Sequence, residues 1–246
     1  MCTVSWIHEA DGYQVLCNRD EKKTRRRAWG PSIRTRHGVR YIAPSDGDSG
    51  GTWMAVNERG LTLCLLNGTG AGGGQVSRGL LIPELIAEPA AWSVAERLWD
   101  RDLTEFAPFT LVALEPGMPA MVVEWKGVDK AVLPDADAMM PLTSSSYETA
   151  RVVERRRRDF RTKLHAAGKL DSAFLYFFHE SHNGHPDAFS TCMHRDDAET
   201  VSFSWVKVTS TEAEFFYSPA SPCQFAPGVR KQLTLVGAEV GDLVCS

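Results

Sequence analysis

The amino-acid sequence predicts an α+β protein whose sheets are mostly antiparallel. Short apolar runs separated by turn residues occupy both ends of the chain, and amphipathic helical stretches lie between them. No repeat or low-complexity linker divides the 246 residues, so we expect one domain over residues 1–246. With 43% hydrophobic residues, a chain of this length can bury a large core without disulfides or metal ions.

The first third of the chain is predicted to consist of strands joined by hairpins. Asp11-Gly12 between two apolar runs is a strong hairpin signal, and the sequence NERG at 57–60 is a second one. A glycine-rich loop then covers residues 68–74. The strands expected in this part are residues 3–8, 13–18, 40–43, 52–56 and 61–66.

Helical spacing of apolar residues begins after this loop and returns later in the chain. Helices are expected over 77–88, 90–103, 147–167 and 171–179, with Gly168 as the stop signal of the longest one. Strands are expected over 109–114, 121–125, 130–133, 189–194, 200–208 and 212–217. This order favours helices packed on antiparallel sheets over alternating β–α units.

Composition and the first residues argue against several classes of partner. A net charge of −4 gives no support for nucleic acid, and no apolar run reaches the roughly 20 residues of a membrane span. The start, MCTVSWIHEADGY, lacks the basic residues and the apolar run of a secretion signal. The six cysteines have no CxxC spacing. We therefore expect free thiols, a cytoplasmic location and no cofactor, and the oligomeric state stays open.

The segment SDGDSGGTW, residues 45–53, contains the GDSGG string that surrounds the nucleophile of trypsin-like serine proteases. Such a protease builds a whole β-barrel between its histidine and its serine, yet only 48 residues precede Ser49. The two histidines in that stretch, His8 and His37, lack the flanking pattern of a protease base. Glycine, aspartate and serine are also the residues of ordinary turns. We therefore interpret residues 47–51 as a turn before a strand.

Cys2 is the first candidate for chemistry. Removal of the initiator methionine, which is usual before a small residue, leaves a thiol and an α-amine on the same residue. The amine has a pKa near ~8 in model peptides and can accept the thiol proton directly or through a water. One residue then supplies both the nucleophile and the base. The alternative is that a cysteine stands at position 2 by chance.

The first hairpin brings the sequence NRDE, residues 18–21, back to the N-terminus. A two-residue loop at the predicted turn pairs Cys2 with Glu21, and a change of one residue in loop length pairs Cys2 with Asp20. In either register Arg19 can lower the thiol pKa or bind a substrate, and Asp20 can hold the amine or the arginine. The alternative is a solvated run of charges at a strand end.

These segments resemble the NRDE family, also called the transport and Golgi organisation protein 2 family. The similarity is carried, in order, by MCTVSW at the start, by NRDE, by GGTW at 50–53 and by a strand that ends in Asn67. Weaker similarity follows in LTSSSYET, residues 142–149, and in CMHRDDAETVSFSW, residues 192–205. In this family the GDSGG string leads into the GGTW strand, so its likeness to a protease is accidental.

The resemblance implies an N-terminal nucleophile hydrolase fold, a four-layer αββα sandwich. Relatives with this fold include penicillin V acylases and bile salt hydrolases, which cleave non-peptide amide bonds. In that fold the N-terminal cysteine attacks, and an asparagine at a strand end helps to form the oxyanion hole. Asn67 fits this description, and a plain turn residue is the alternative for it. Ser144 stands where relatives tend to have a second asparagine, and Arg195 aligns with a late arginine of the acylases.

Two functions follow from the residues and the resemblance together. The first is a cysteine hydrolase that cleaves a carbon–nitrogen amide bond of a small molecule, with catalytic residues Cys2, Arg19, Asp20 and Asn67. The second is a non-catalytic carrier of haem or an acyl lipid on the same fold, which the resemblance also implies. Trp53 is a candidate ligand-binding residue, and it can line an apolar pocket together with the tryptophans at 6, 92 and 99 or belong to the core.

Two other patterns are weaker. His179, His182 and His185 are three residues apart, with His194 further on, and such a set can bind zinc. A glycine and a proline break the helix that would align these histidines, so we expect no metal site. The segments TRRR at 24–27 and RRRR at 155–158 are expected to be solvated, with an anionic ligand at Arg25 to Arg27 as the alternative.

Overall fold

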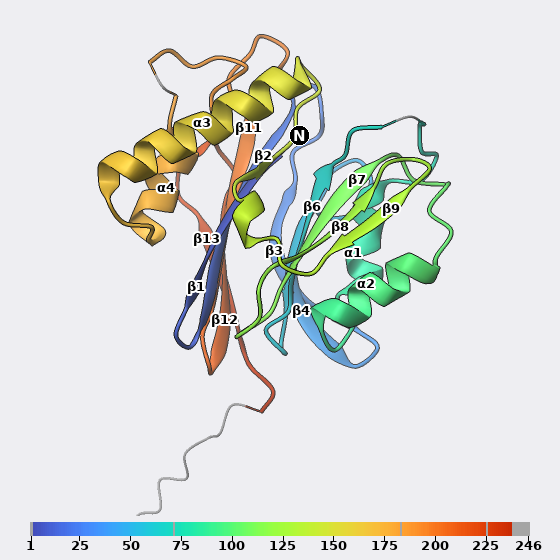
Figure 1. Ribbon diagram of the computed structural model, residues 1–246. Helices are drawn as coiled ribbons and strands as arrows, with labels where there is room; N and C mark the ends of the chain where they lie inside the picture. Colours follow the sequence, from blue (N-terminus) through green and yellow to red (C-terminus); the bar gives the residue numbers. More distant parts are fainter. Residues whose placement is uncertain (1, 71, 183, 225, 238–246) are drawn as a thin grey trace, which may run out of the picture.

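The computed structural model describes residues 2–70, 72–182, 184–224 and 226–237. Two antiparallel sheets are stacked face to face, and helices cover the outer side of each sheet (Figure 1). The layers therefore run helix, sheet, sheet, helix, which confirms the expected αββα sandwich. Within the described ranges, no helix is long and apolar enough to cross a membrane.

The first sheet carries the N-terminus. Its strand order is β10-β1-β2-β11-β12-β13, so both strands of the first hairpin lie inside the sheet. Helices α3 and α4 pack on its outer face through an aromatic cluster that includes Phe160, Phe178 and Phe203. The elements are β1 (Cys2–Glu9), β2 (Gly12–Lys22), β10 (Leu142–Thr143), β11 (Ala198–Val208), β12 (Glu212–Ser218), β13 (Val229–Thr234), α3 (Thr149–Ala167) and α4 (Ser172–Glu180).

The second sheet has the order β3-β4-β5-β6-β7-β8-β9, with α1 and α2 on its outer face. Its neighbouring strands are all consecutive in the chain, so it is a simple meander. The elements are β3 (Trp29–Arg36), β4 (Val39–Ser45), β5 (Met54–Asn57), β6 (Thr62–Asn67), β7 (Phe109–Leu114), β8 (Met121–Trp125), β9 (Lys130–Leu133), α1 (Leu81–Leu85) and α2 (Ala91–Asp100). Strands β7 to β9 have the predicted bounds.

The inner faces of the two sheets share the largest apolar cluster of the molecule. Trp6 of β1 and Tyr13 of β2 contribute from the first sheet, and Val56 of β5 contributes from the second. The Tyr13 hydroxyl also donates a hydrogen bond of 2.6 Å to Oγ1 of Thr62 in the opposite sheet. Cys2 belongs to the same cluster, so its side chain lies between the sheets.

Three strands that the sequence pattern did not predict all lie at sheet edges. β10 and β13 are the two edges of the first sheet, and β3 is an edge of the second. An edge strand is exposed along one side, so it needs no apolar alternation and tolerates proline and charges. β3 (WGPSIRTR) and β13 (VRKQLT) are mostly exposed and show this composition.

Two other predicted elements differ from the structure. The strand expected over 189–194 is wrong, because Asp187 Oδ1 accepts the backbone N–H groups of Phe189 and Ser190 at 2.8 Å and forms a turn there. The helix expected over 77–88 is shorter and begins with a 3₁₀ turn, Arg78–Leu80, before α1. The long helix does end at Ala167, and Gly168 has the left-handed φ of 70° that favours glycine.

Both predicted registers of the first hairpin are wrong. Cys2 lies opposite Arg19, and the loop is formed by residues 10–11, with Gly12 already in β2. Gly12 serves close packing rather than the turn, because a Cβ there would lie 2.0 Å from the carbonyl oxygen of Val208. The observed register therefore places the arginine of NRDE directly beside the cysteine.

Candidate active site

A cavity of about 230 Å³ lies between the sheets where β1 begins, and the 5%-exposed Cys2 side chain is part of its wall. Predicted site residues that line it are Cys2, Arg19, Trp53 and Asn67. The other lining residues are Glu21, Arg25, Asp46, Ser49, Thr52, Leu65, Ser77, Arg78 and Gly79. Asp20, Ser144 and Arg195 are not part of the wall.

The four residues of NRDE divide between the two faces of β2. Successive side chains of a strand point to opposite faces, so Arg19 and Glu21 line the cavity while the other two face the helices. The Asn18 amide donates a hydrogen bond of 2.8 Å to the backbone carbonyl of His179 at the end of α4. Two residues of the motif thus form the site, and Asn18 and Asp20 attach the strand to the helical layer.

Asp20 forms a buried ion pair with Arg156 of α3. The Asp20 Oδ2 to Arg156 Nη1 distance is 3.2 Å, and both side chains are 1% exposed. Asp20 Oδ1 accepts a hydrogen bond of 2.6 Å from Thr200 Oγ1, and Arg156 donates to the hydroxyls of Thr3 and Thr143 at 2.8 and 2.9 Å. The expectation that the whole second arginine run is solvated is therefore wrong for Arg156.

Arg19 is held between an acid and an aromatic ring. Its guanidinium donates to the Asp46 carboxylate, and the guanidinium carbon lies 4.4 Å from the ring centroid of Trp53. Glu21 Oε2 is 3.7 Å from Arg19 Nη2. A planar guanidinium fixed by stacking and a charged hydrogen bond loses little freedom on binding a substrate.

Asp46 connects the arginines to the GDSGG turn. It accepts from Arg25 Nη2 at 2.7 Å and from the backbone N–H and the hydroxyl of Ser49, both at 2.8 Å. Burial alone would raise the pKa of Asp46, but the bonds from Arg25 and Ser49 and the charge of Arg19 hold it well below its usual range. Ser49 is therefore a turn residue that orients Asp46, and its hydroxyl has no histidine partner in the described residues.

Asn67 and Arg78 complete the cavity from the second sheet. Asn67 is the exposed last residue of β6, and Arg78 lies in the 3₁₀ turn before α1. Arg78 Nη1 donates to the carbonyl of Pro108 at 2.7 Å, and Arg78 forms no ion pair with the described residues. Burial lowers the pKa of Arg78, while the charges of Cys2 and Glu21 oppose that shift. Asp46 and Arg78 were not predicted, because nothing in their local sequence indicates their partners.

Ser144 holds the backbone of Cys2. The backbone N of Cys2 donates to Ser144 Oγ at 3.1 Å, and the backbone N of Ser144 donates to the Cys2 carbonyl at 2.9 Å. Strand β10, which ends one residue earlier, pairs with β1 through Thr3 and Thr143 and brings Ser144 to this position. The serine hydroxyl therefore lies at the nitrogen atom that becomes the α-amine when Met1 is removed.

Arg195 and the histidine series lie elsewhere. Arg195 binds Asp197 at 2.7 Å and stacks at 5.0 Å on the ring of Tyr147. His179 is fully buried and bonded through its two ring nitrogens to Ser5 and Asn18, at 2.8 and 3.0 Å. Within the predicted series 179, 182 and 185, it is His182 that belongs to a cluster able to hold a metal.

The pKa of the Cys2 thiol is lowered, whereas the pKa values of the neighbouring Cys17 and Cys64 thiols are raised. A hydrogen bond from the Cys17 thiol lowers the pKa of Cys2; burial and Asp20 oppose this shift, and Arg19 adds to it. The same interaction, with burial, raises the pKa of Cys17 well above its ordinary value. Burial also raises the pKa of Cys64, a third cysteine of the inter-sheet cluster. Thiolate is the reactive form of cysteine, so these shifts favour Cys2 as the nucleophile.

Comparison with solved structures shows the fold of the chain. Penicillin V acylase from Agrobacterium tumefaciens is similar with a TM-score of 0.59 and 10% identity, over 94% of this chain and 85% of that chain. The N-acylethanolamine-hydrolyzing acid amidase ortholog of Caenorhabditis elegans gives 0.58 and 13%, over 96% and 100%. A mutant conjugated bile acid hydrolase from Clostridium perfringens gives 0.57 and 9%, over 95% and 92%. The fold is thus that of the N-terminal nucleophile hydrolases, as expected.

Comparison with sequences identifies the family. Curated protein sequences give no match to the chain. The family model described as Transport and Golgi organisation 2 matches residues 1–211, which include every residue of the cavity wall. The chain therefore belongs to the Transport and Golgi organisation 2 family.

Proposed function

We propose that the protein is an N-terminal cysteine hydrolase that cleaves a carbon–nitrogen amide bond of a small molecule. The observation that carries the proposal is that Cys2, whose thiol pKa is lowered, shares one cavity with Arg19, Asn67 and Arg78. A nucleophile, an amide donor and two cations then surround the place where a substrate carbonyl would lie. The acylase and amidase neighbours, which share the fold, support the same class of reaction.

The reaction requires the α-amine of Cys2, so the proposal includes removal of Met1. The amine nitrogen, held 3.1 Å from Ser144 Oγ, takes the thiol proton as the sulfur attacks the substrate carbonyl carbon. The Asn67 amide donates to the oxyanion that forms. Collapse breaks the carbon–nitrogen bond, and the amine returns the proton to the leaving nitrogen. Water then attacks the thioester, which releases a carboxylic acid and restores the thiol.

The wall of the cavity indicates a polar or anionic substrate. Arg78 has no acidic partner among the described residues and is partly buried beside Cys2, so it offers charge to a substrate carboxylate. Arg25 and Glu21 also line this cavity, with Arg25 Nε 3.5 Å from Glu21 Oε2. They also border a second cavity of about 260 Å³, lined by Lys22, Arg27 and neighbours, into which a longer substrate can extend.

A carrier of haem or an acyl lipid is the other function considered for this fold. Sites for such ligands are mostly apolar. The cavity at Cys2 has a volume of about 230 Å³, and its apolar side chains other than Cys2 are Trp53 and Leu65. The polar and charged lining of this cavity therefore favours the hydrolase over the carrier.

The first test of the hydrolase combines mass and activity. Intact mass of the purified chain is expected to show that Met1 is absent. A panel of acyl amides with and without a carboxylate is then incubated with the wild type and with Cys2→Ala, and release of the free amine is measured. Cys2→Ala is expected to remove all release above background. Retained Met1 in a chain that still hydrolyses amides, or equal activity of Cys2→Ala, contradicts the proposal.

A further inference from the structure

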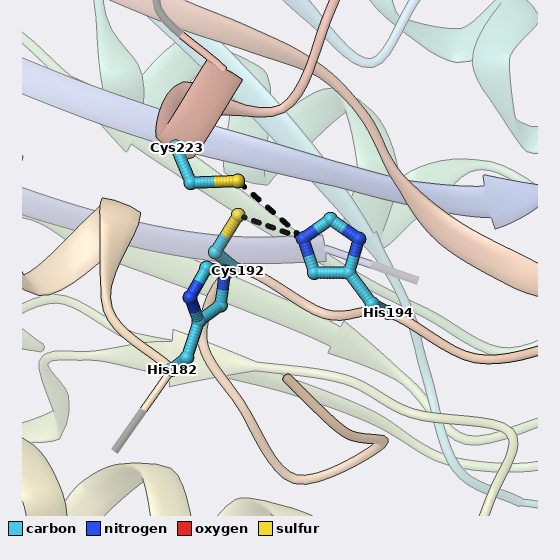
Figure 2. Close-up of side chains that lie close together, drawn as sticks. All are labelled: His182, Cys192, His194 and Cys223. Atoms are coloured by element: carbon cyan, nitrogen blue, oxygen red, sulfur yellow. Dashed lines mark hydrogen bonds between the residues drawn. The ribbon is translucent and has the colours of Figure 1, made fainter. Parts of the chain in front are cut away.

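Four side chains with metal-ligating atoms converge on the far side of β2 from the cavity. They are His182, Cys192, His194 and Cys223, and one ligand atom of each lies within 4.8 Å of the others. Figure 2 shows the two sulfur atoms on one side of the cluster and the His194 ring facing them. His194 Nε2 is 3.6 Å from Cys192 Sγ and 3.5 Å from Cys223 Sγ.

The four residues come from three segments that are separate in sequence. His182 follows the end of α4, and Cys192 and His194 belong to the turn-rich segment that leads into β11. Cys223 lies in the 3₁₀ turn Pro222–Gln224, after β12. The expectation of no metal site was based on histidines alone, because the two cysteine ligands join the histidines only in the fold.

We propose that His182, Cys192, His194 and Cys223 bind a Zn²⁺ ion with tetrahedral geometry. Two thiolates and two imidazoles are a donor set typical of structural zinc. Zinc bonds of about 2.3 Å to sulfur and 2.0–2.1 Å to nitrogen, at tetrahedral angles, place the two atoms about 3.6 Å apart. The observed separations of 3.6 and 3.5 Å match that edge of the tetrahedron.

The surroundings of the cluster support a metal in preference to four unrelated side chains. Cys192 is 0% exposed, and the buried Nε2 of His182 has no hydrogen-bond partner among the described residues. A buried ring nitrogen without a partner is costly, whereas a metal ion satisfies it. The backbone is fixed as well: Ser190 Oγ donates to the His182 carbonyl at 3.0 Å, and Cys192 N donates to the Ser181 carbonyl at 3.1 Å.

A site with four protein ligands leaves no open position, so the zinc has a structural role. It joins the segment between α4 and β11 to the 3₁₀ turn after β12. Met193, between two of the ligands, donates its backbone N–H to Thr200 Oγ1 at 2.8 Å, and that hydroxyl donates to Asp20 at 2.6 Å. The metal therefore also fixes the residue that orients the Asp20 carboxylate. This proposal does not depend on the proposed hydrolase.

The test measures zinc directly in the full-length chain. The protein is produced with added zinc under reducing conditions, dialysed, and its metal content is determined by mass spectrometry. The wild type is expected to hold about one zinc per chain, and the double variant Cys192→Ser/Cys223→Ser none. His185→Ala is the matched control, since this exposed histidine of the same segment is outside the cluster and its variant keeps the zinc.

Cobalt gives a readout that does not need a folded variant. Wild-type chain loaded with Co²⁺ is expected to show the visible bands of tetrahedral cobalt and a thiolate-to-cobalt charge-transfer band. No zinc or cobalt bound by folded, reduced wild type overturns the proposal. Zinc loss from His185→Ala equal to that of the double variant overturns it too. Peptide mapping that finds a Cys192–Cys223 disulfide in protein kept under reducing conditions also overturns the proposal.

Discussion

Cys2 lies between the two sheets, whereas Cys192 follows Thr191, whose carbonyl accepts from Asn18 on the helix-facing side of β2. Both cysteines are buried, and the pKa values of their thiols are shifted in opposite directions. The Cys17 hydrogen bond lowers the pKa of Cys2, while burial raises the pKa of Cys192 above its ordinary value. Cys2 opens into a cavity lined by arginines, whereas Cys192 faces imidazoles and a second thiol. The comparison teaches that neighbouring donors and access, rather than burial, decide whether a cysteine suits attack or ligation.

The two regions are joined through one residue of β2. Asp20 accepts from Thr200, which contacts the backbone of the Cys192 segment, and its charge also acts on the Cys2 thiol. Arg156 neutralises this carboxylate from the helical layer. Substitutions at the Asp20–Arg156 pair or in one region alone therefore test how far the two regions depend on each other.

The largest expected effect comes from breaking the Asp20–Arg156 pair. Arg156→Gln leaves a buried carboxylate without its charged partner, so we expect the free energy of unfolding to fall by about 3–5 kcal/mol. Arg158→Gln, an exposed arginine of the same run, is the control and is expected to change it by less than about 0.5 kcal/mol. Urea unfolding measures both, and equal effects would contradict a buried, specific pair.

Asn67→Ala tests the proposed oxyanion donor on the Cys2 side alone. If Asn67 donates to the oxyanion, kcat on a hydrolysed amide should fall by about 10²–10³, with a smaller change in KM. Zinc content should stay at the wild-type value, because Asn67 ends β6 of the second sheet, whereas the cluster lies in segments next to β11 and β12 of the first sheet. A change in KM without a change in kcat would assign Asn67 to substrate binding instead.

His179 contributes a pH dependence that belongs to neither cysteine site. Burial lowers the pKa of His179 to about 3, so the folded protein keeps it neutral while the unfolded chain takes up a proton near pH 6.5. Its contribution to stability is complete above about pH 6.5 and is lost as the pH falls toward 3, at up to about 1.4 kcal/mol per unit. His179→Gln should flatten this slope in urea titrations. An unchanged slope would show that other groups control the acid response.

Ser49→Ala gives the smallest expected effect. The serine hydroxyl orients Asp46, and Asp46 keeps two other bonds from Arg25. Hydrolysis should therefore stay within a few-fold of wild type. A loss as large as that of Cys2→Ala would show that the GDSGG string marks the nucleophile after all.

Strands with an apolar run could be predicted from the sequence, and three edge strands without such a run could not. β7, β8 and β9, the last of them an edge strand, follow apolar runs whose bounds are those observed, while β3, β10 and β13 are edge strands without such a run. Turn geometry was the other limit. In the sequence, a glycine that packs closely against Val208 cannot be distinguished from a glycine in a hairpin loop. The predicted pairing of β1 with β2 was therefore wrong.

The residues of the candidate site also divide into those that a local sequence pattern indicates and those that it does not. Cys2, Arg19 and Asn67 lie in short distinctive segments, and the fold brings them to one cavity. Asp46, Arg78 and the zinc ligands depend on partners far away in the sequence, which no local pattern contains. Asp20 is next to Arg19 in the motif yet faces the helices, because strand alternation separates neighbours.

Competitive labelling of the thiols tests the central claim about Cys2 most directly. The folded chain without Met1 is treated with limiting iodoacetamide near neutral pH, and each cysteine is followed by peptide mass mapping. Cys2 is expected to react faster than the other five cysteines. Arg19→Ala should slow Cys2 by about tenfold for each ~1.4 kcal/mol of lost thiolate stabilisation. Cys2 labelling no faster than Cys245, which lies outside the described residues, would contradict the account.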